Sequence, residues 1–72
     1  MKVNSADCSW NNLVNCAEKC GFNIKEGRKH SKVFADNGDF ITTIPRETRL
    51  NRYTAEGIIK AFQKFGCIIS FR

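Results

Sequence analysis

Apolar residues near the start of the chain recur with the period of an α-helix. They fall at positions i, i+3, i+4 and i+7, which places them on one helical face: Trp10, Leu13, Val14 and Ala17. The pattern predicts a helix that begins at Ala6 or Ser9 and ends at Cys20. Ser5, Asp7 and Ser9 are each candidate N-caps. Gly21 follows the last periodic residue, where a glycine commonly ends a helix.

A second helical pattern lies near the end of the chain. Thr54 is its candidate N-cap, and Tyr53 with Ile58 would form a hydrophobic staple around the first turn. Gly66 is the expected stop. The residues on the apolar face of this helix share the same spacing: Ala55, Ile58, Ile59, Phe62 and Phe65.

Between the two helices the pattern changes to the alternation of β-strands. We predict strands over Phe22–Glu26, His30–Ala35 and Phe40–Ile44. A turn at Gly27-Arg28-Lys29 separates the first two. The pair Asn37-Gly38 predicts a tight hairpin turn with positive φ at both residues, and Pro45 ends the third strand because it has no amide donor.

These elements predict one α+β domain over residues 1–72. Two helices would pack on one face of a small antiparallel sheet, and the other face would stay open to a ligand. The segment Cys67–Phe71 could add a short fourth strand to a sheet edge. A domain of this length buries a modest core and leaves little room for a deep cofactor pocket, so we expect chemistry on a shallow surface and no cofactor.

The charge balance favours a polyanionic partner, although basic residues also serve solubility. Twelve Lys and Arg oppose seven Asp and Glu, which gives a net charge of +5. A small basic domain attracts phosphates by electrostatics and counterion release. No apolar run approaches the ~20 residues that cross a bilayer, and the first residues lack the apolar segment of a signal peptide. A cytoplasmic protein with no membrane partner is expected.

Four cysteines raise the question of zinc or disulfides: Cys8, Cys16, Cys20 and Cys67. No C-x-x-C pair occurs, and the chain has a single histidine, so no metal site is expected. Without a secretion signal the thiols should stay reduced. We therefore expect the cysteines to serve as small buried residues.

The segment from Gly27 to Lys32 combines one imidazole, His30, with the cations Arg28, Lys29 and Lys32. RNA carries its own nucleophile, the 2′-hydroxyl. Its cleavage requires a proton acceptor, a proton donor and cations near the phosphorus. Imidazole titrates near neutral pH and can carry the proton, while Lys and Arg can hold the phosphate. A lone histidine among lysines is more often a solvated turn residue, so spacing alone favours that interpretation over catalysis.

A second basic cluster follows the third predicted strand: Arg46, Arg49 and Arg52. Because Arg46 comes directly after that strand, it could lie near the strand of His30. For Arg49, a solvated loop is the simpler interpretation. The aromatic residues Trp10, Phe62 and Phe65 have helical spacing, which is typical of core packing rather than of base stacking.

The stretch from Leu13 to Phe62 resembles the HicA (YcfA-like) toxins, which are mRNA interferases. The similar features, in order, are Gly21-Phe22 after the first helix, Gly27-Arg28-Lys29-His30, the Asn37-Gly38 turn, Thr42-Thr43-Ile44-Pro45-Arg46, and Tyr53-Thr54-Ala55 followed by Ile58-Ile59. The resemblance implies a dsRBD-like fold, α-β-β-β-α, the fold of double-stranded-RNA-binding domains.

It also implies a function, that of the toxin in a type II toxin-antitoxin pair. His30 would be the catalytic residue of a metal-independent mRNA endoribonuclease, and a HicB-like antitoxin protein would cover the site. Gly27 would form the turn, with Arg28, Lys29, Lys32 and Arg46 binding RNA. The chain departs from the family where Glu47 replaces a frequent histidine and Lys29 a small residue.

Two other functions stay open. The same basic face could grip duplex RNA without cleaving it, through phosphates and 2′-hydroxyls. An unpaired edge at Ile68-Ile69 could instead add a strand to another protein, or form a homodimer.

Overall fold

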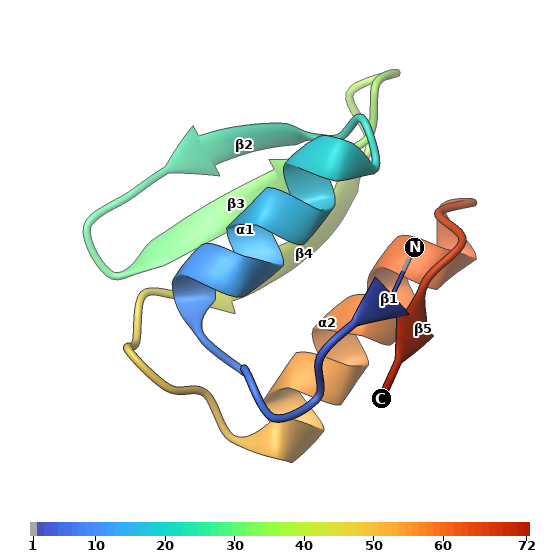
Figure 1. The fold of residues 1–72 in the computed structure, drawn as a ribbon. Coiled ribbons are helices and arrows are strands. Elements are labelled where there is room, and N and C mark those ends of the chain that lie inside the picture. Colours follow the sequence, from blue (N-terminus) through green and yellow to red (C-terminus); the bar gives the residue numbers. More distant parts are fainter. Residues whose placement is uncertain (1) are drawn as a thin grey trace.

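The computed structural model describes residues 2–72 as a small α+β protein with two helices, a three-stranded antiparallel sheet and a separate parallel strand pair (Figure 1). The elements in chain order are β1 (Lys2–Val3), α1 (Trp10–Lys19), β2 (Asn23–Glu26), β3 (His30–Phe34), β4 (Phe40–Pro45), α2 (Arg52–Lys64) and β5 (Ser70–Phe71). The central order α1-β2-β3-β4-α2 is the one that the hydrophobic pattern predicts. No helix among the described residues is long and apolar enough to cross a membrane.

Of the candidate caps for the first helix, Ser9 is the N-cap. Its side chain accepts a hydrogen bond from the Asn12 amide at 3.1 Å, which satisfies one of the free amides of the first turn. Gly21 follows the helix with a φ of 83°, a backbone conformation that glycine adopts readily. The predicted start at Ser9 and the predicted stop are therefore confirmed.

The second helix begins earlier than predicted. Asn51, not Thr54, is its N-cap, and the Asn51 side chain accepts from the Tyr53 amide at 2.7 Å. Leu50 before the cap and Ala55 in the first turn are both buried, whereas Tyr53 is 84% exposed. The staple predicted between Tyr53 and Ile58 is wrong, because burial of Leu50 sets where the chain enters the helix.

The three-stranded sheet has the order β2-β3-β4. The Asn37-Gly38 turn exists, but Gly38 alone has a positive φ, of 93°. The Ala35 amide donates to the Asp39 carbonyl at 2.7 Å, so the loop holds three residues instead of two. The Asn37 side chain accepts from the Asp39 amide at 3.0 Å and stabilises this wider loop.

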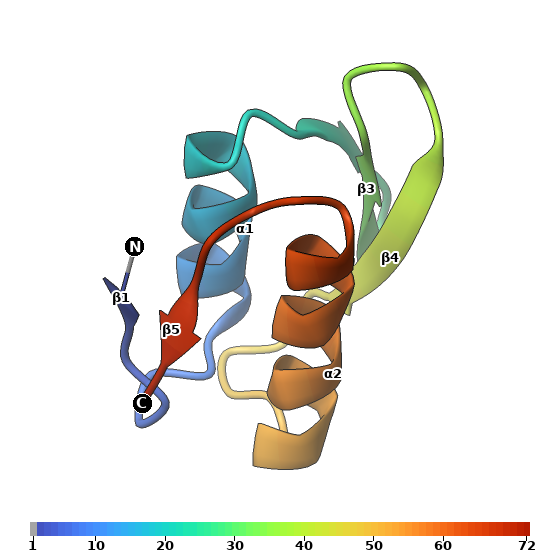
Figure 2. The same cartoon turned by 90° about the vertical axis from the view of Figure 1, so that its right-hand side faces the viewer.

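Both helices cover the same face of the sheet, and the strand pair β1-β5 lies on the far side of the helices (Figure 2). The core lies between these layers and draws on every one of them, including Leu13, Val33, Ile44, Ile59, Phe62 and Ile69. Phe65, predicted on the apolar face of the second helix, is its C-cap and is 38% exposed.

The C-terminal strand does not extend the three-stranded sheet. Ser70 and Phe71 pair in parallel with Lys2 and Val3, which the sequence pattern did not mark as a strand. Ile69 is buried against the core, while Ile68 is 86% exposed. The apolar contacts of Ile69 and Val3 with the helices explain why the two ends of the chain meet there.

The cysteines divide into two pairs. Cys8 and Cys16 are buried in the core, as small apolar residues were expected to be. Cys20 and Cys67 form a disulfide, with their Cα atoms 5.6 Å apart. The expectation that all four thiols stay reduced is therefore wrong: the ends of α1 and α2 bring these two residues within bonding reach, which spacing in the sequence does not reveal.

Candidate functional site

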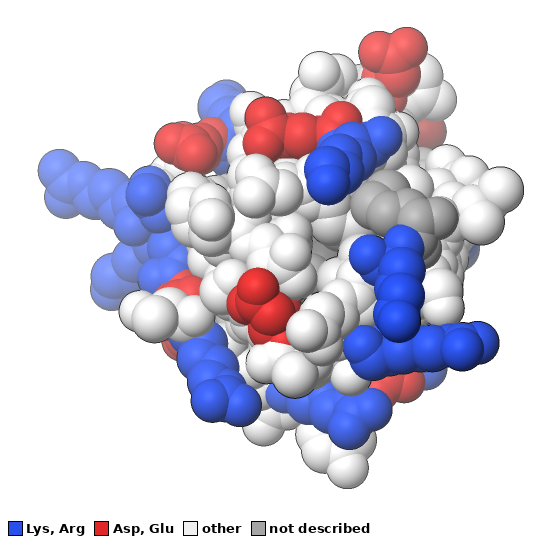
Figure 3. All heavy atoms as spheres, viewed as in Figure 1, with Lys and Arg blue, Asp and Glu red and all other residues white. Residues whose placement is uncertain are grey.

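The turn between β2 and β3 is closed by a hydrogen bond from the Gly27 amide to the His30 carbonyl, at 2.9 Å. A Cβ at position 27 would lie 2.9 Å from that same oxygen, so any larger residue would force the turn to open. The turn predicted at Gly27-Arg28-Lys29 is present. Arg28 and Lys29 are exposed at its tip. Figure 3 shows Lys and Arg side chains gathered at the end of the molecule where this turn lies.

His30 is the first residue of β3, and its side chain is exposed. The next residue, Ser31, is fully buried, and Lys32 is exposed again. Because successive side chains of a strand point to opposite faces, the imidazole and the Lys32 ammonium group share the sheet face that carries no helices. A shallow hollow of about 140 Å³ lies there, lined by Lys25, Glu26, Gly27, His30 and Lys32.

Lys25 belongs to this hollow, and we did not predict it as a site residue. It is the register partner of Lys32 across the β2-β3 ladder. Directly opposed residues of an antiparallel pair lie on the same face, so both lysines extend from the sheet face that carries the imidazole. Strand alternation already places Lys25 on the polar side of its strand, but its pairing with Lys32 depends on register.

Glu26 also lines the hollow. It ends β2 and is exposed. The hollow therefore combines an imidazole with two lysines. These groups can accept a proton, donate a proton and balance negative charge.

Arg46 lies on the other side of the same turn. Its amide donates to the Lys29 carbonyl at 2.8 Å, and its Nη1 donates to the Gly27 carbonyl at 3.2 Å. Its guanidinium carbon lies 4.7 Å from the centroid of the Trp10 ring, a cation–π contact. Arg46 therefore supports the turn that presents His30, and it retains further donors for a ligand.

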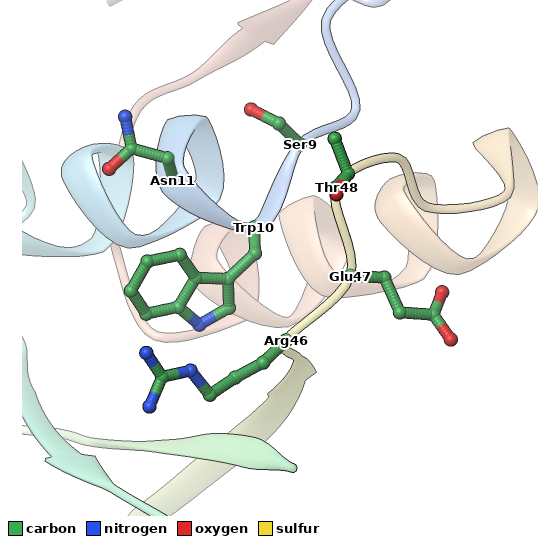
Figure 4. A pocket seen from close by; sticks show the side chains of 6 residues that line it. All are labelled: Ser9, Trp10, Asn11, Arg46, Glu47 and Thr48. Carbon is green, nitrogen blue, oxygen red and sulfur yellow. The ribbon is translucent and has the colours of Figure 1, made fainter. Parts of the chain in front are cut away.

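Arg46 lines a different hollow from His30. This second hollow measures about 300 Å³ and is formed by Ser9, Trp10, Asn11, Arg46, Glu47 and Thr48 (Figure 4). No residue is common to the two hollows. Figure 4 shows the Glu47 carboxylate turned away from the Arg46 guanidinium, so the acid that follows Arg46 does not occupy its hydrogen-bonding positions.

Behind the His30 hollow, the Trp10 indole donates to the hydroxyl of the fully buried Ser31, at 2.8 Å. Trp10 also packs against the core, as its helical spacing predicts. Ser31 was not predicted to matter. In the sequence, only its neighbours His30 and Lys32 suggested chemistry. Ser31 stands out in the structure, because it is a serine at a buried position among apolar residues.

Among residues 2–72, no group of three or more His, Cys, Asp or Glu side chains is placed to hold a metal ion. Comparison with known proteins finds no protein family, no curated protein and no solved structure that matches this chain.

Proposed function

We propose that this protein is a metal-independent endoribonuclease that cleaves mRNA, the toxin of a HicA-like toxin-antitoxin pair. The observation that supports the proposal is the exposed imidazole of His30 in a hollow that also contains Lys25 and Lys32. An imidazole that is open to solvent can exchange a proton with a ribose hydroxyl at neutral pH. Two ammonium groups beside it supply positive charge where a phosphate would lie.

In the proposed reaction, the 2′-oxygen of the ribose attacks the adjacent phosphorus. His30 takes the proton from this hydroxyl as the O2′–P bond forms, and the P–O5′ bond breaks. The departing 5′-oxygen receives a proton from a water molecule. Lys25 and Lys32 stabilise the negative charge on the phosphorane oxygens. The products are a 2′,3′-cyclic phosphate and a 5′-hydroxyl end.

Arg28, Lys29 and Arg46 extend the cationic surface around the hollow. Arg28 and Lys29 would contact phosphates on either side of the cleaved bond, where their exposure at the tip of the turn leaves them accessible. Arg46 would act through its remaining donors while it holds the Gly27 carbonyl. Gly27 itself keeps the turn tight enough to present the imidazole.

The remaining parts of the proposal follow from the resemblance. The order α1-β2-β3-β4-α2 fits a dsRBD-like fold, and a HicB-like antitoxin would block the His30 hollow. A protein that cleaves mRNA would act in the cytoplasm, where thiols are mostly reduced. The Cys20–Cys67 bond joins the segments that follow α1 and α2, and neither cysteine lines the hollow.

The test compares the native chain with His30→Ala on a single-stranded mRNA substrate in the presence of EDTA. We expect the native protein to cleave and the variant to be slower by about 100-fold or more. Lys60→Ala is the matched control, since it removes an exposed cation from α2, away from the hollow. An unfolded His30→Ala protein would be recognised by circular dichroism. Equal cleavage by a folded His30→Ala protein would overturn the proposal.

A non-catalytic RNA-binding module is the second candidate. It is favoured by the cations at the turn, which need no imidazole in order to bind phosphates. Native protein that binds RNA with a steep salt dependence but never shortens it would select this function. If the native protein bound no RNA, the remaining candidate would be a protein-interaction module of the same fold.

A further inference from the structure

The face of the three-stranded sheet that carries no helices presents a row of polar, cationic and aromatic side chains. We name it the open sheet face and define it by Lys25, His30, Lys32, Phe34, Phe40 and Thr43. Three register pairs place these residues together: Lys25 with Lys32, Lys32 with Thr43, and Phe34 with Phe40. Both helices lie on the opposite side of the sheet (Figure 2).

At one end of this face lies a pair of phenylalanines. The Phe34 and Phe40 ring centroids are 5.7 Å apart with the rings at 71°, an edge-to-face pair. Phe40 is 53% exposed although it is a large apolar residue. Edge-to-face packing uses the edge of one ring and leaves ring surface available for another flat group.

At the other end lies the His30 hollow. Four residue steps separate His30 from Phe34 along β3, which corresponds to about 13 Å in a strand. Lys32 lies between His30 and Phe34 along β3, and Lys25 is its register partner on β2. The open sheet face therefore offers, in order, a stacking surface, two cations and the imidazole.

We infer that the open sheet face binds a short single-stranded segment of RNA, with one base stacked on Phe40 and the neighbouring phosphates on Lys25 and Lys32. This inference deepens the proposed function and rests on RNA being the ligand. Cationic residues beside exposed aromatic rings are the arrangement that single strands recognise, because phosphates need positive charge and unpaired bases need a flat apolar partner. A duplex keeps its bases stacked inside and cannot offer one to Phe40.

The arrangement also predicts what the protein selects. Stacking accepts any base, because every base has a flat π-surface. Phe40 would therefore set the position of the strand relative to His30 without reading its sequence. The substrate class is an unpaired region of RNA that is held on one side of the cleaved bond.

The experiment measures binding of a single-stranded RNA oligonucleotide that carries one 2-aminopurine, with His30→Ala as the parent so that the RNA stays intact. We expect binding to the parent to change the 2-aminopurine fluorescence at one position of the label. Phe40→Ala should weaken binding by about 5- to 100-fold and remove that change. Phe40→Tyr keeps a flat ring and should restore both, which excludes a folding defect as the cause.

Tyr53→Ala is the matched control, because Tyr53 is an aromatic residue that is 84% exposed on α2. It should bind as the parent does. Equal affinity of Phe40→Ala and the parent, or tighter binding of duplex than of single-stranded RNA, would overturn the inference. The two proposals fail separately: cleavage without Phe40 dependence removes this one, whereas Phe40-dependent binding by a native chain that never cleaves removes the nuclease.

Discussion

The indole N–H of Trp10 donates to the hydroxyl of Ser31 at 2.8 Å, and this hydrogen bond joins α1 to the strand that carries His30. Ser31 is the buried polar residue of the described core. Its side chain points inward because its two neighbours, His30 and Lys32, point outward. The strand alternation that exposes His30 therefore also turns Ser31 inward, where its hydrogen bond to Trp10 holds this strand against α1.

Ser31→Ala should lower the free energy of unfolding by about 1–3 kcal/mol, because it leaves the partly buried Trp10 N–H without its acceptor. Urea denaturation followed by circular dichroism measures this loss. The double variant Trp10→Phe with Ser31→Ala removes both partners, so its loss should be smaller than the sum of the two single losses. Strictly additive losses would show that the hydrogen bond contributes nothing.

Gly27→Ala should destabilise the protein by about 1–3 kcal/mol, because the added Cβ would lie too close to a backbone carbonyl of the turn. The carbon would meet the His30 carbonyl at 2.9 Å, so the turn must open and displace the start of β3. We expect RNA cleavage to fall further than stability alone explains. Thermal unfolding and a cleavage assay on the folded variant test this together.

Gly57→Ala is the matched control for this substitution. Gly57 lies within α2, and a Cβ there meets nothing within 4 Å. Alanine in a helix interior restricts the unfolded chain, so this variant should gain about 0.4–1 kcal/mol. If Gly27→Ala behaved like Gly57→Ala, the close approach at the turn would have no energetic consequence.

Replacement of both Cys20 and Cys67 by serine should lower the free energy of unfolding by about 2–4 kcal/mol. The two residues are 47 apart in sequence, so the disulfide restricts a long loop of the unfolded chain. Urea denaturation of the native chain with and without dithiothreitol should show the same difference. Cleavage by the folded variant should be unchanged. If the native protein were alkylated at all four cysteines without a reductant, the Cys20–Cys67 disulfide would be absent.

Burial raises the pKa of the Cys16 thiol above its ordinary value of 9.0, although Lys19 acts in the opposite direction. The thiolate is therefore easier to form in the unfolded chain. The buried, protonated thiol contributes fully to the free energy of unfolding below the pKa of the unfolded chain. This contribution is lost as pH rises through the pKa of the folded protein. We expect the free energy of unfolding to fall above pH 9.0, and less steeply in Cys16→Ala. Parallel curves for the two proteins would exclude Cys16 as a source.

The helices and strands could be predicted because their signals act over a few residues. The apolar face of α1, the stop at Gly21 and the strand of His30 each follow from local periodicity or from a glycine with positive φ. The second helix shows the limit of such signals. Asn51 and Thr54 can each cap a helix, and burial of Leu50 favours the start at Asn51.

By itself, the sequence determined the order of the central elements and the turn at Gly27, because periodicity and turn residues are local properties. Alternation along a strand put His30 and Lys32 on the same face, but the tertiary structure decided that this face is exposed. Only the tertiary structure decided that Lys25 joins the hollow, that Ser31 anchors Trp10, that β5 pairs with β1, and that Cys20 meets Cys67. Each of these contacts joins residues whose separation depends on register or on how the helices pack. A pattern over a few neighbouring residues carries no information about the distance between residues far apart in the chain.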